Sequence, residues 1–233
     1  MKATFYRHPF RLSAVLFFLS FLMLFSVSAA FAGDQVSSVV ECIRERYGHL
    51  PGLTVTYERE ILTRSMALLG DQVPSDRAEG RMHFKPPHYL RVEQETPSRE
   101  SVISDGDILW WYVPEKKQAY RYPAQKLGKE LKIFADIFQG LREAEESFML
   151  SLSRDDEGQK RRLELIPDPP WPDIDHITLH LASENCRIQT IEIYNVLGGM
   201  TRFKLGEQTV EESFAESFFT FSPPEDTEVI TEE

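Results

Sequence analysis

The chain has 233 residues, a formal net charge of −11 and two cysteines. Its acidity argues against nucleic acid and anionic membrane surfaces as partners, since both repel a negatively charged protein. The length allows one large domain or two small ones with a sizeable apolar core.

The first 32 residues have the pattern of a secretory signal peptide. Three basic residues precede an apolar run over residues 12–27, and Ala30-Phe31-Ala32 then supplies an A-x-A cleavage pattern. An uncleaved membrane anchor is the alternative, because the apolar run is marginally long enough to span a bilayer. We expect cleavage after Ala32, which leaves residues 33–233 as a single domain with a formal charge of −14.

The two cysteines, Cys42 and Cys186, both belong to the exported part of the chain. In an oxidising compartment they could form one disulfide that joins the first predicted helix to a later hairpin. Two unpaired thiols far apart are the alternative, because the sequence does not give the distance between them.

An amphipathic helix is predicted over residues 34–50, where apolar side chains recur at intervals of three and four. Asp34 is suited to be its N-cap. A strand with alternating apolar and polar residues follows over residues 53–62. Residues 70–80 are predicted to form a polar loop.

Residues 81–123 have the pattern of several short strands joined by tight turns. The Asp105-Gly106 pair indicates a hairpin in which both central residues need a positive φ. Residues 115–117 form the next predicted turn. These strands should therefore be antiparallel neighbours.

A helical insertion is predicted over residues 129–148, with a local break at Gly140, and strands resume after it. The pattern gives about ten strands in total, and a twisted antiparallel sheet of that size tends to curl. The expected fold is thus mainly β with some α, with helices covering a concave interior.

Catalytic and metal-binding motifs such as G-x-S-x-G, H-E-x-x-H and C-x-x-C do not occur in the sequence. His176 and His180 lie four apart on a predicted strand, which separates them by ~13 Å and favours two solvent-facing histidines over a metal pair. Residues 155–157 are better explained as a solvated turn than as acid/base carboxylates. We therefore predict that the protein is not an enzyme and has no catalytic residue, metal site or cofactor.

The segment over residues 80–122 resembles the hallmark segment of the LolA family, the periplasmic carriers of outer-membrane lipoproteins. In that family a glycine opens a strand, a proline follows it, and an S-D-G turn leads into an aromatic strand. Near the C-terminus, residues 197–201 and 219–224 resemble the family's L-G-q-T hairpin and its terminal F-x-F-x-P-P. The residues of the first segment that carry the likeness are Gly80, Pro87, Leu90, Arg91, Pro97, Ser104, Asp105, Gly106, Leu109, Trp110, Tyr112, Pro114 and Gln118.

The resemblance implies an incomplete, unclosed antiparallel β-barrel covered by helices, with an apolar cavity for the acyl chains of lipoproteins. It also implies residence in the periplasm of a Gram-negative cell, loading from an inner-membrane ABC-type extractor and handover to an outer-membrane receptor. We expect a monomer that binds acylated lipoproteins or lipid acyl chains and no nucleic acid.

In studied members of the family an arginine directly before the strand-ending proline latches a helical lid by hydrogen bonds. This sequence has Pro86 at that position. A latch would therefore have to use Lys85 or Arg91.

The paired tryptophans Trp110 and Trp111 must point to opposite faces of their strand. We predict that Trp110 faces the cavity and Trp111 the outer surface, although the sequence does not fix the register and the reverse is open. The predicted lining of the cavity and lid consists of Phe84, Leu90, Val92, Trp110, Tyr112, Leu131, Phe134, Phe138 and Leu141.

The sequence also permits other interpretations of the fold and the function. The same residues could form the solid core of a closed sandwich. The fold could also carry or sense another amphiphilic lipid, house an enzyme in its cavity, or bind a partner protein as a regulator.

Overall fold

The computed structural model describes residues 35–69, 75–124, 129–141, 144–154 and 161–231. The signal-peptide prediction for residues 1–32 lies outside these ranges, as do Asp34 and residues 155–157. Among the described residues, no helix has the length and apolar character needed to cross a membrane.

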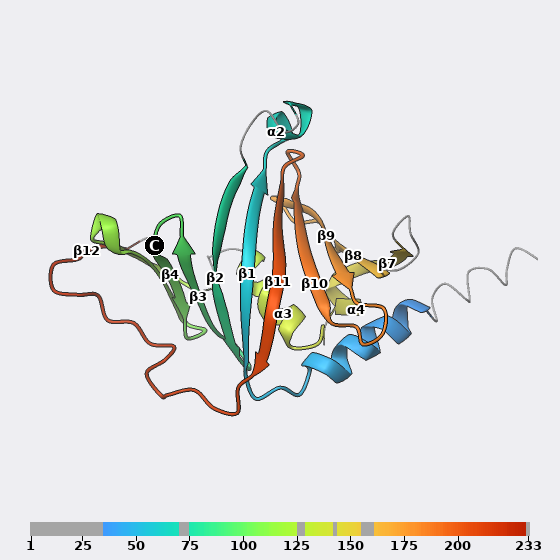
Figure 1. The fold of residues 1–233 in the computed structure, drawn as a ribbon, viewed down its shortest axis with the longest axis horizontal. Coiled ribbons are helices and arrows are strands. Elements are labelled where there is room, and N and C mark those ends of the chain that lie inside the picture. The colour runs from blue at the N-terminus through green and yellow to red at the C-terminus, as the bar shows by residue number, and fades with distance from the viewer. Residues whose placement is uncertain (1–34, 70–74, 125–128, 142–143, 155–160, 232–233) are drawn as a thin grey trace, which may run out of the picture.

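The described strands form one twelve-stranded sheet in the order β12-β6-β5-β4-β3-β2-β1-β11-β10-β9-β8-β7 (Figure 1). Neighbouring strands are antiparallel except β12, which pairs with β6 in parallel. Because β12 and β7 end the order without pairing with each other, the predicted unclosed antiparallel sheet is confirmed, with two strands more than expected. The strands are β1 (Leu53–Leu62), β2 (Asp76–Lys85), β3 (Tyr89–Thr96), β4 (Glu100–Ser104), β5 (Ile108–Val113), β6 (Gln118–Pro123), β7 (Phe148–Arg154), β8 (Arg161–Pro167), β9 (Ile174–Leu181), β10 (Ile188–Asn195), β11 (Met200–Val210) and β12 (Glu228–Thr231).

Short helices complete the fold. The first covers residues 35–47, close to the predicted range. The others are α2 (Arg64–Leu69), α3 (Lys129–Phe138), α4 (Ala144–Ser147) and the 3₁₀ turn η2 (Pro114–Lys116). The prediction of a loop over residues 70–80 was wrong at its end, because β2 begins at Asp76, and α2 was missed because six residues are too few for a helical period to stand out.

The predicted insertion over residues 129–148 is two helices, since the chain turns sharply after α3. Gly140 has φ 77° and Leu141 has φ 54°. A Cβ added at Gly140 would lie 2.8 Å from the Cα of Arg44, so only glycine lets this turn pack against the first helix. The break predicted at Gly140 is thus present.

The turn between β4 and β5 has three residues rather than two. Gly106 has φ 99°, whereas Asp105 does not have a positive φ, contrary to the expectation for both. Instead, the Asp105 Oδ1 accepts hydrogen bonds from the backbone N–H groups of Asp107 at 3.0 Å and Ile108 at 2.8 Å. These hydrogen bonds from the carboxylate close the turn, which therefore does not need the two positive φ angles of a two-residue turn.

The first helix closes one end of the space enclosed by the sheet. Cys42 on this helix forms a disulfide with Cys186, which precedes β10, with Cα atoms 6.0 Å apart. The Tyr47 hydroxyl accepts a hydrogen bond from the Ile188 N–H at 3.0 Å and donates one to Gln208 at 2.8 Å. These bonds fix the helix to β10 and β11, and its buried side chains join the main apolar cluster.

After β11 the chain crosses the outer face of the sheet as an extended segment, residues 211–227, before it forms β12 (Figure 1). We refer to this segment as the C-terminal strap. Phe214 and Phe218 contact the His83 ring at 6.3 and 5.0 Å between centroids. Phe221 contacts the rings of Trp110 and Tyr112 at 5.5 and 5.1 Å. The strap therefore buries apolar side chains on the outer face of β2 to β5.

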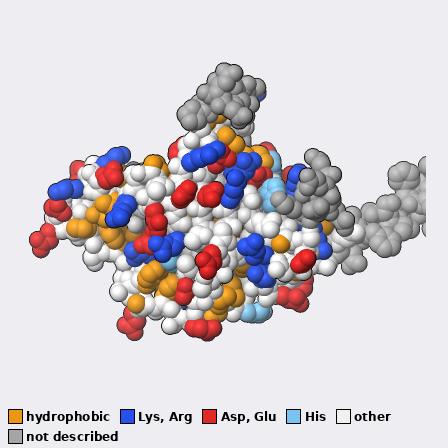
Figure 2. Space-filling view, viewed as in Figure 1, with side chains coloured by type: hydrophobic (Ala, Val, Ile, Leu, Met, Phe, Trp, Pro, Cys, Tyr) orange, Lys and Arg blue, Asp and Glu red, His pale blue; other side chains and the backbone are white. Residues whose placement is uncertain are grey.

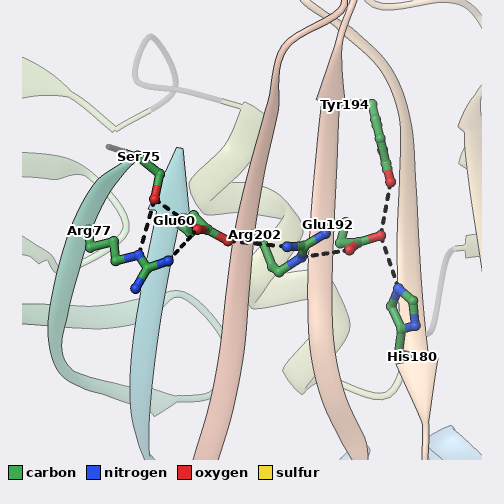
Figure 3. Close-up of polar contacts among 7 residues, drawn as sticks. All are labelled: Glu60, Ser75, Arg77, His180, Glu192, Tyr194 and Arg202. Carbon is green, nitrogen blue, oxygen red and sulfur yellow. Dashed lines mark hydrogen bonds and ion pairs between the residues drawn. The ribbon is translucent and has the colours of Figure 1, made fainter. Parts of the chain in front are cut away.

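Over the central strands the outer face is polar. Acidic and basic side chains alternate over the central strands in Figure 2. Figure 3 shows a chain of ion pairs that runs across the strands, in which Arg202 lies between two carboxylates, with Nη1 3.1 Å from Glu60 and Nε 2.8 Å from Glu192. Glu192 also contacts His180 Nε2 at 3.0 Å and accepts a hydrogen bond from the Tyr194 hydroxyl at 2.9 Å.

Candidate functional site

The inner face of the sheet carries an apolar surface built by strand register. Leu53 lies opposite Phe84, and Phe84 lies opposite Leu90. Directly opposed residues point to the same face of a sheet, so these three side chains form a row, and all are at most 3% exposed. Leu90 is itself opposite Ser104, and Ser104 is opposite Leu109, which extends the row to β5.

Helix α3 packs against this surface. The Phe138 ring lies 6.0 Å from the Tyr47 ring and 6.2 Å from the Phe84 ring, and Phe134 meets Phe203 edge-on at 4.9 Å. Phe134, Phe138 and Leu141 are all buried. Val92 is half-buried and packs against the same cluster. The side chain of Leu131 lies outside the described residues.

The faces assigned to the paired tryptophans were wrong. Trp110 lies opposite Ile103 and Trp111 opposite Val102, while Val102 faces Val92 of the inner surface. Trp110 and Tyr112 therefore point outward, where both contact Phe221 of the C-terminal strap. Because the strap covers the outer face here, β5 has apolar side chains on both faces. The pattern of apolar residues in the sequence therefore does not show which face is the inner one.

Trp111 belongs instead to an aromatic row on the inner face. Its ring stacks on Tyr120 at 4.9 Å, and Tyr120 stacks on Tyr122 at 6.4 Å. The Trp111 Nε1–H donates to Glu100 at 3.0 Å. All three rings are half-buried, so this row is an apolar wall that α3 does not cover fully.

The two candidates for a lid latch also point away from α3. Lys85 follows the inward-facing Phe84 and Arg91 follows the inward-facing Leu90, so alternation places both on the outer face. The Lys85 ammonium lies 5.3 Å from the Tyr89 ring centroid, and Arg91 donates a hydrogen bond of 2.9 Å to the Phe218 carbonyl. Arg91 thus fastens the C-terminal strap, and a lid latch at either residue is excluded by this geometry.

A different side chain joins α3 to the strand ends. Gln139, the residue after α3, donates a hydrogen bond of 2.8 Å from Nε2 to the backbone carbonyl of Pro87. This neutral bond lies at the β2–β3 turn. No sequence pattern singles out Gln139, because its partner is a backbone atom far away in the chain.

Several titratable side chains of the sheet take part in hydrogen bonds and ion pairs or are buried in the apolar interior. Burial disfavours the ionised form of Glu192, but hydrogen bonds from His180, Arg202 and Tyr194 outweigh it and lower its pKa to about 2. On the inner face, burial raises the pKa of Tyr57 to about 12, so this phenol stays neutral. In the part of the chain that the structure describes, no three His, Cys, Asp or Glu residues are placed to hold a metal ion. His176 stacks on Tyr194 at 4.2 Å and lies 2.7 Å from Asp175, and His180 pairs with Glu192, so both predicted solvent-facing histidines are in fact half-buried.

Comparison with known proteins agrees with this architecture. The family model described as outer membrane lipoprotein carrier protein LolA matches residues 69–222, more than half of the chain. The chain belongs to the LolA family. An outer-membrane lipoprotein carrier protein of Chromohalobacter salexigens is 28% identical over 66% of this chain and 71% of its own length. Another, of Francisella tularensis subsp. novicida, is 20% identical over 91% of this chain and 95% of its own length.

The fold likeness extends to solved structures. The crystal structure of an uncharacterized conserved protein from Thermus thermophilus covers 85% of this chain and 99% of its own length, with a TM-score of 0.52 and 13% identity. At that identity the likeness concerns the fold alone. The LolA family assignment therefore rests on the family model and on the two lipoprotein carriers.

Proposed function

We propose that this protein shields the acyl chains of lipoproteins in the space between its inner sheet face and α3, and carries them from the inner to the outer membrane. The observation that carries the proposal is the insertion of Phe134 and Phe138 from a short helix into the apolar inner face of an unclosed sheet. The two lipoprotein carriers similar to this chain support the cargo class.

The physical need for such a carrier is large. Each methylene group moved out of water is worth ~0.8 kcal/mol, so exposing one long acyl chain costs on the order of 10 kcal/mol. In the closed molecule, the aromatic side chains of α3 occupy the apolar surface that an acyl chain would use. Cargo therefore exchanges with the lid, and the balance between two apolar occupants keeps binding reversible.

The lid is suited to such an exchange. The hydrogen bond from Gln139 to Pro87, at the end of α3, is neutral and is worth about 0.5–1.5 kcal/mol. The half-buried row of Trp111, Tyr120 and Tyr122 supplies further apolar surface next to the region that α3 covers. Moving α3 would join these two surfaces into one.

The remaining steps belong to the same proposal. An inner-membrane ABC-type extractor would load the carrier, and an outer-membrane receptor would take the cargo. The protein would act in the periplasm as a monomer after removal of residues 1–32. Intact mass measurement of the exported protein should give the mass of the chain from Gly33 onward, and sedimentation should give one chain per particle.

The cargo is tested by purifying the protein from the periplasm without detergent and extracting bound molecules for mass spectrometry. Acyl-bearing lipoproteins are expected. A glycolipid or another amphiphile would instead identify a carrier of a different lipid on the same fold. A hydrophilic metabolite without acyl species would refute carriage.

A further inference from the structure

The inner face of β1 carries a charged side chain. Arg59 is opposite Phe203 on β11 and opposite Ala78 on β2. Phe203 contacts Phe134 of α3, so this position faces the lid side of the sheet. Along β1, alternation places Arg59 on the same face as the buried Tyr57.

The guanidinium of Arg59 is poorly satisfied. Its Nε is buried and has no hydrogen-bond partner. Its Nη2 lies 3.9 Å from Asp76 Oδ1, which is beyond hydrogen-bond distance, and the Asp76 side chain is 57% exposed. A buried donor without an acceptor is costly and rare in native proteins, so an acceptor supplied from outside the chain would explain it.

The position of Arg59 along β1 is also informative. Leu53 and Val55 of the same face are at most 2% exposed, at the end of the strand near the first helix. The Arg59 side chain is 28% exposed, six residues further towards α2. The distance between Leu53 and Arg59 is about 20 Å along a strand, on the scale of an extended acyl chain. The inner face of β1 is thus apolar at its closed end and cationic where solvent reaches it.

We propose that Arg59 binds the ester and amide carbonyl oxygens at the junction between the acyl chains and the polar part of the cargo. The acyl chains then extend towards Leu53 and Phe84, and the polar part remains at the solvent-accessible end. Arginine suits this role because its guanidinium presents five donors in a fixed plane. Ala78, which lies opposite Arg59, has a side chain of a single methyl group and supplies no competing acceptor. This inference rests on the proposed function and adds how the carrier selects and orients an amphiphile.

The test uses two ligands and two variants of the full mature chain. Diphenylhexatriene is a hydrocarbon fluorophore without an acceptor atom, and a synthetic triacylated lipopeptide, which carries ester and amide carbonyls, displaces it. In Arg59→Met, the affinity for diphenylhexatriene should be unchanged or higher. The lipopeptide concentration that displaces half of the bound diphenylhexatriene should rise at least about ten-fold. Thermal stability should not fall, because methionine removes an unsatisfied donor and keeps the apolar stem.

Arg81→Met is the matched control, since Arg81 lies on the outer face and pairs with Glu95. It should leave both affinities unchanged. Unchanged lipopeptide displacement in Arg59→Met would overturn the inference, as would an equal loss of both ligands together with lower thermal stability, because that indicates a structural role. Failure of the wild-type chain to bind either ligand would instead refute the proposed function.

Discussion

Replacing Phe138 by alanine tests whether α3 is a movable lid or a fixed part of the core. Phe138 is 1% exposed, and its ring contacts Tyr47, Phe84 and Phe134. Truncation of so buried a phenylalanine costs about 3–5 kcal/mol. If α3 is a lid, this cost falls on the closed state of α3 and not on the sheet.

A weaker closed state should strengthen the binding of an apolar ligand. The apparent affinity of a ligand that needs the open form scales with the population of that form. A loss of about 3 kcal/mol could raise this population by up to two powers of ten. Allowing for the contact that the lost ring would make with the ligand, we expect diphenylhexatriene to bind at least about ten-fold more tightly to Phe138→Ala.

The assay combines fluorescence titration with hydrogen exchange. Amides of α3 should exchange faster in Phe138→Ala, while those of β1 and β2 keep their protection. Ile103→Ala is a suitable control, because Ile103 is also 1% exposed but lies on the outer face. It should lower stability without tighter ligand binding. Weaker binding in Phe138→Ala, with all strands losing protection together, would show that α3 is a permanent part of the core.

Three further predictions concern other parts of the molecule. Replacing Cys42 and Cys186 by serine opens a link between residues 144 apart, which should cost about 2–5 kcal/mol in the free energy of unfolding by urea; an unchanged midpoint would contradict this. Trp110→Ala should speed chymotrypsin cleavage in the C-terminal strap and leave diphenylhexatriene binding intact, whereas Trp111→Ala should weaken binding; the opposite result would show that the two faces are reversed. Because the pKa of Glu192 is lowered from 4.5 to about 2, its ionised form stabilises the fold above pH 4.5, and this stability is lost as the pH falls towards 2. Melting curves of Glu192→Gln should therefore show a shallower loss across that pH range, and identical slopes would argue against the ion-pair chain.

The alternation of apolar and polar residues predicted the strands better than it predicted which of their faces is the inner one. β1 was predicted with its observed bounds, because apolar residues that are buried alternate with polar ones in its first half. The pattern became ambiguous at β4 and β5, where the C-terminal strap buries the outer face as well. Ile103 is buried beneath the strap and not in the interior, so a count of apolar residues could not assign the faces.

The sequence predicted only part of the candidate site, because contacts between distant segments are not visible in a local pattern. Phe84, Phe134 and Phe138 pack together between the sheet and α3. Leu90 is buried on the same face of the sheet, opposite Phe84. That these residues bind a ligand stays a prediction. Arg59 was overlooked because a charged residue in a strand normally points to solvent. Its inward direction follows from alternation along β1, but its lack of a partner is a property of the assembled interior.

Local conformation and family membership could be read from the order of the residues. Side-chain periodicity follows from backbone geometry, which needs no distant contact, and the ordered motifs over residues 80–122 suffice for the LolA resemblance. Three properties emerged from the folded molecule instead: the face that α3 covers, the meeting of Cys42 with Cys186, and the polar atoms that lack partners. These properties depend on the register between strands and on segments far apart in the chain, and the free energy that selects them arises only when those segments pack.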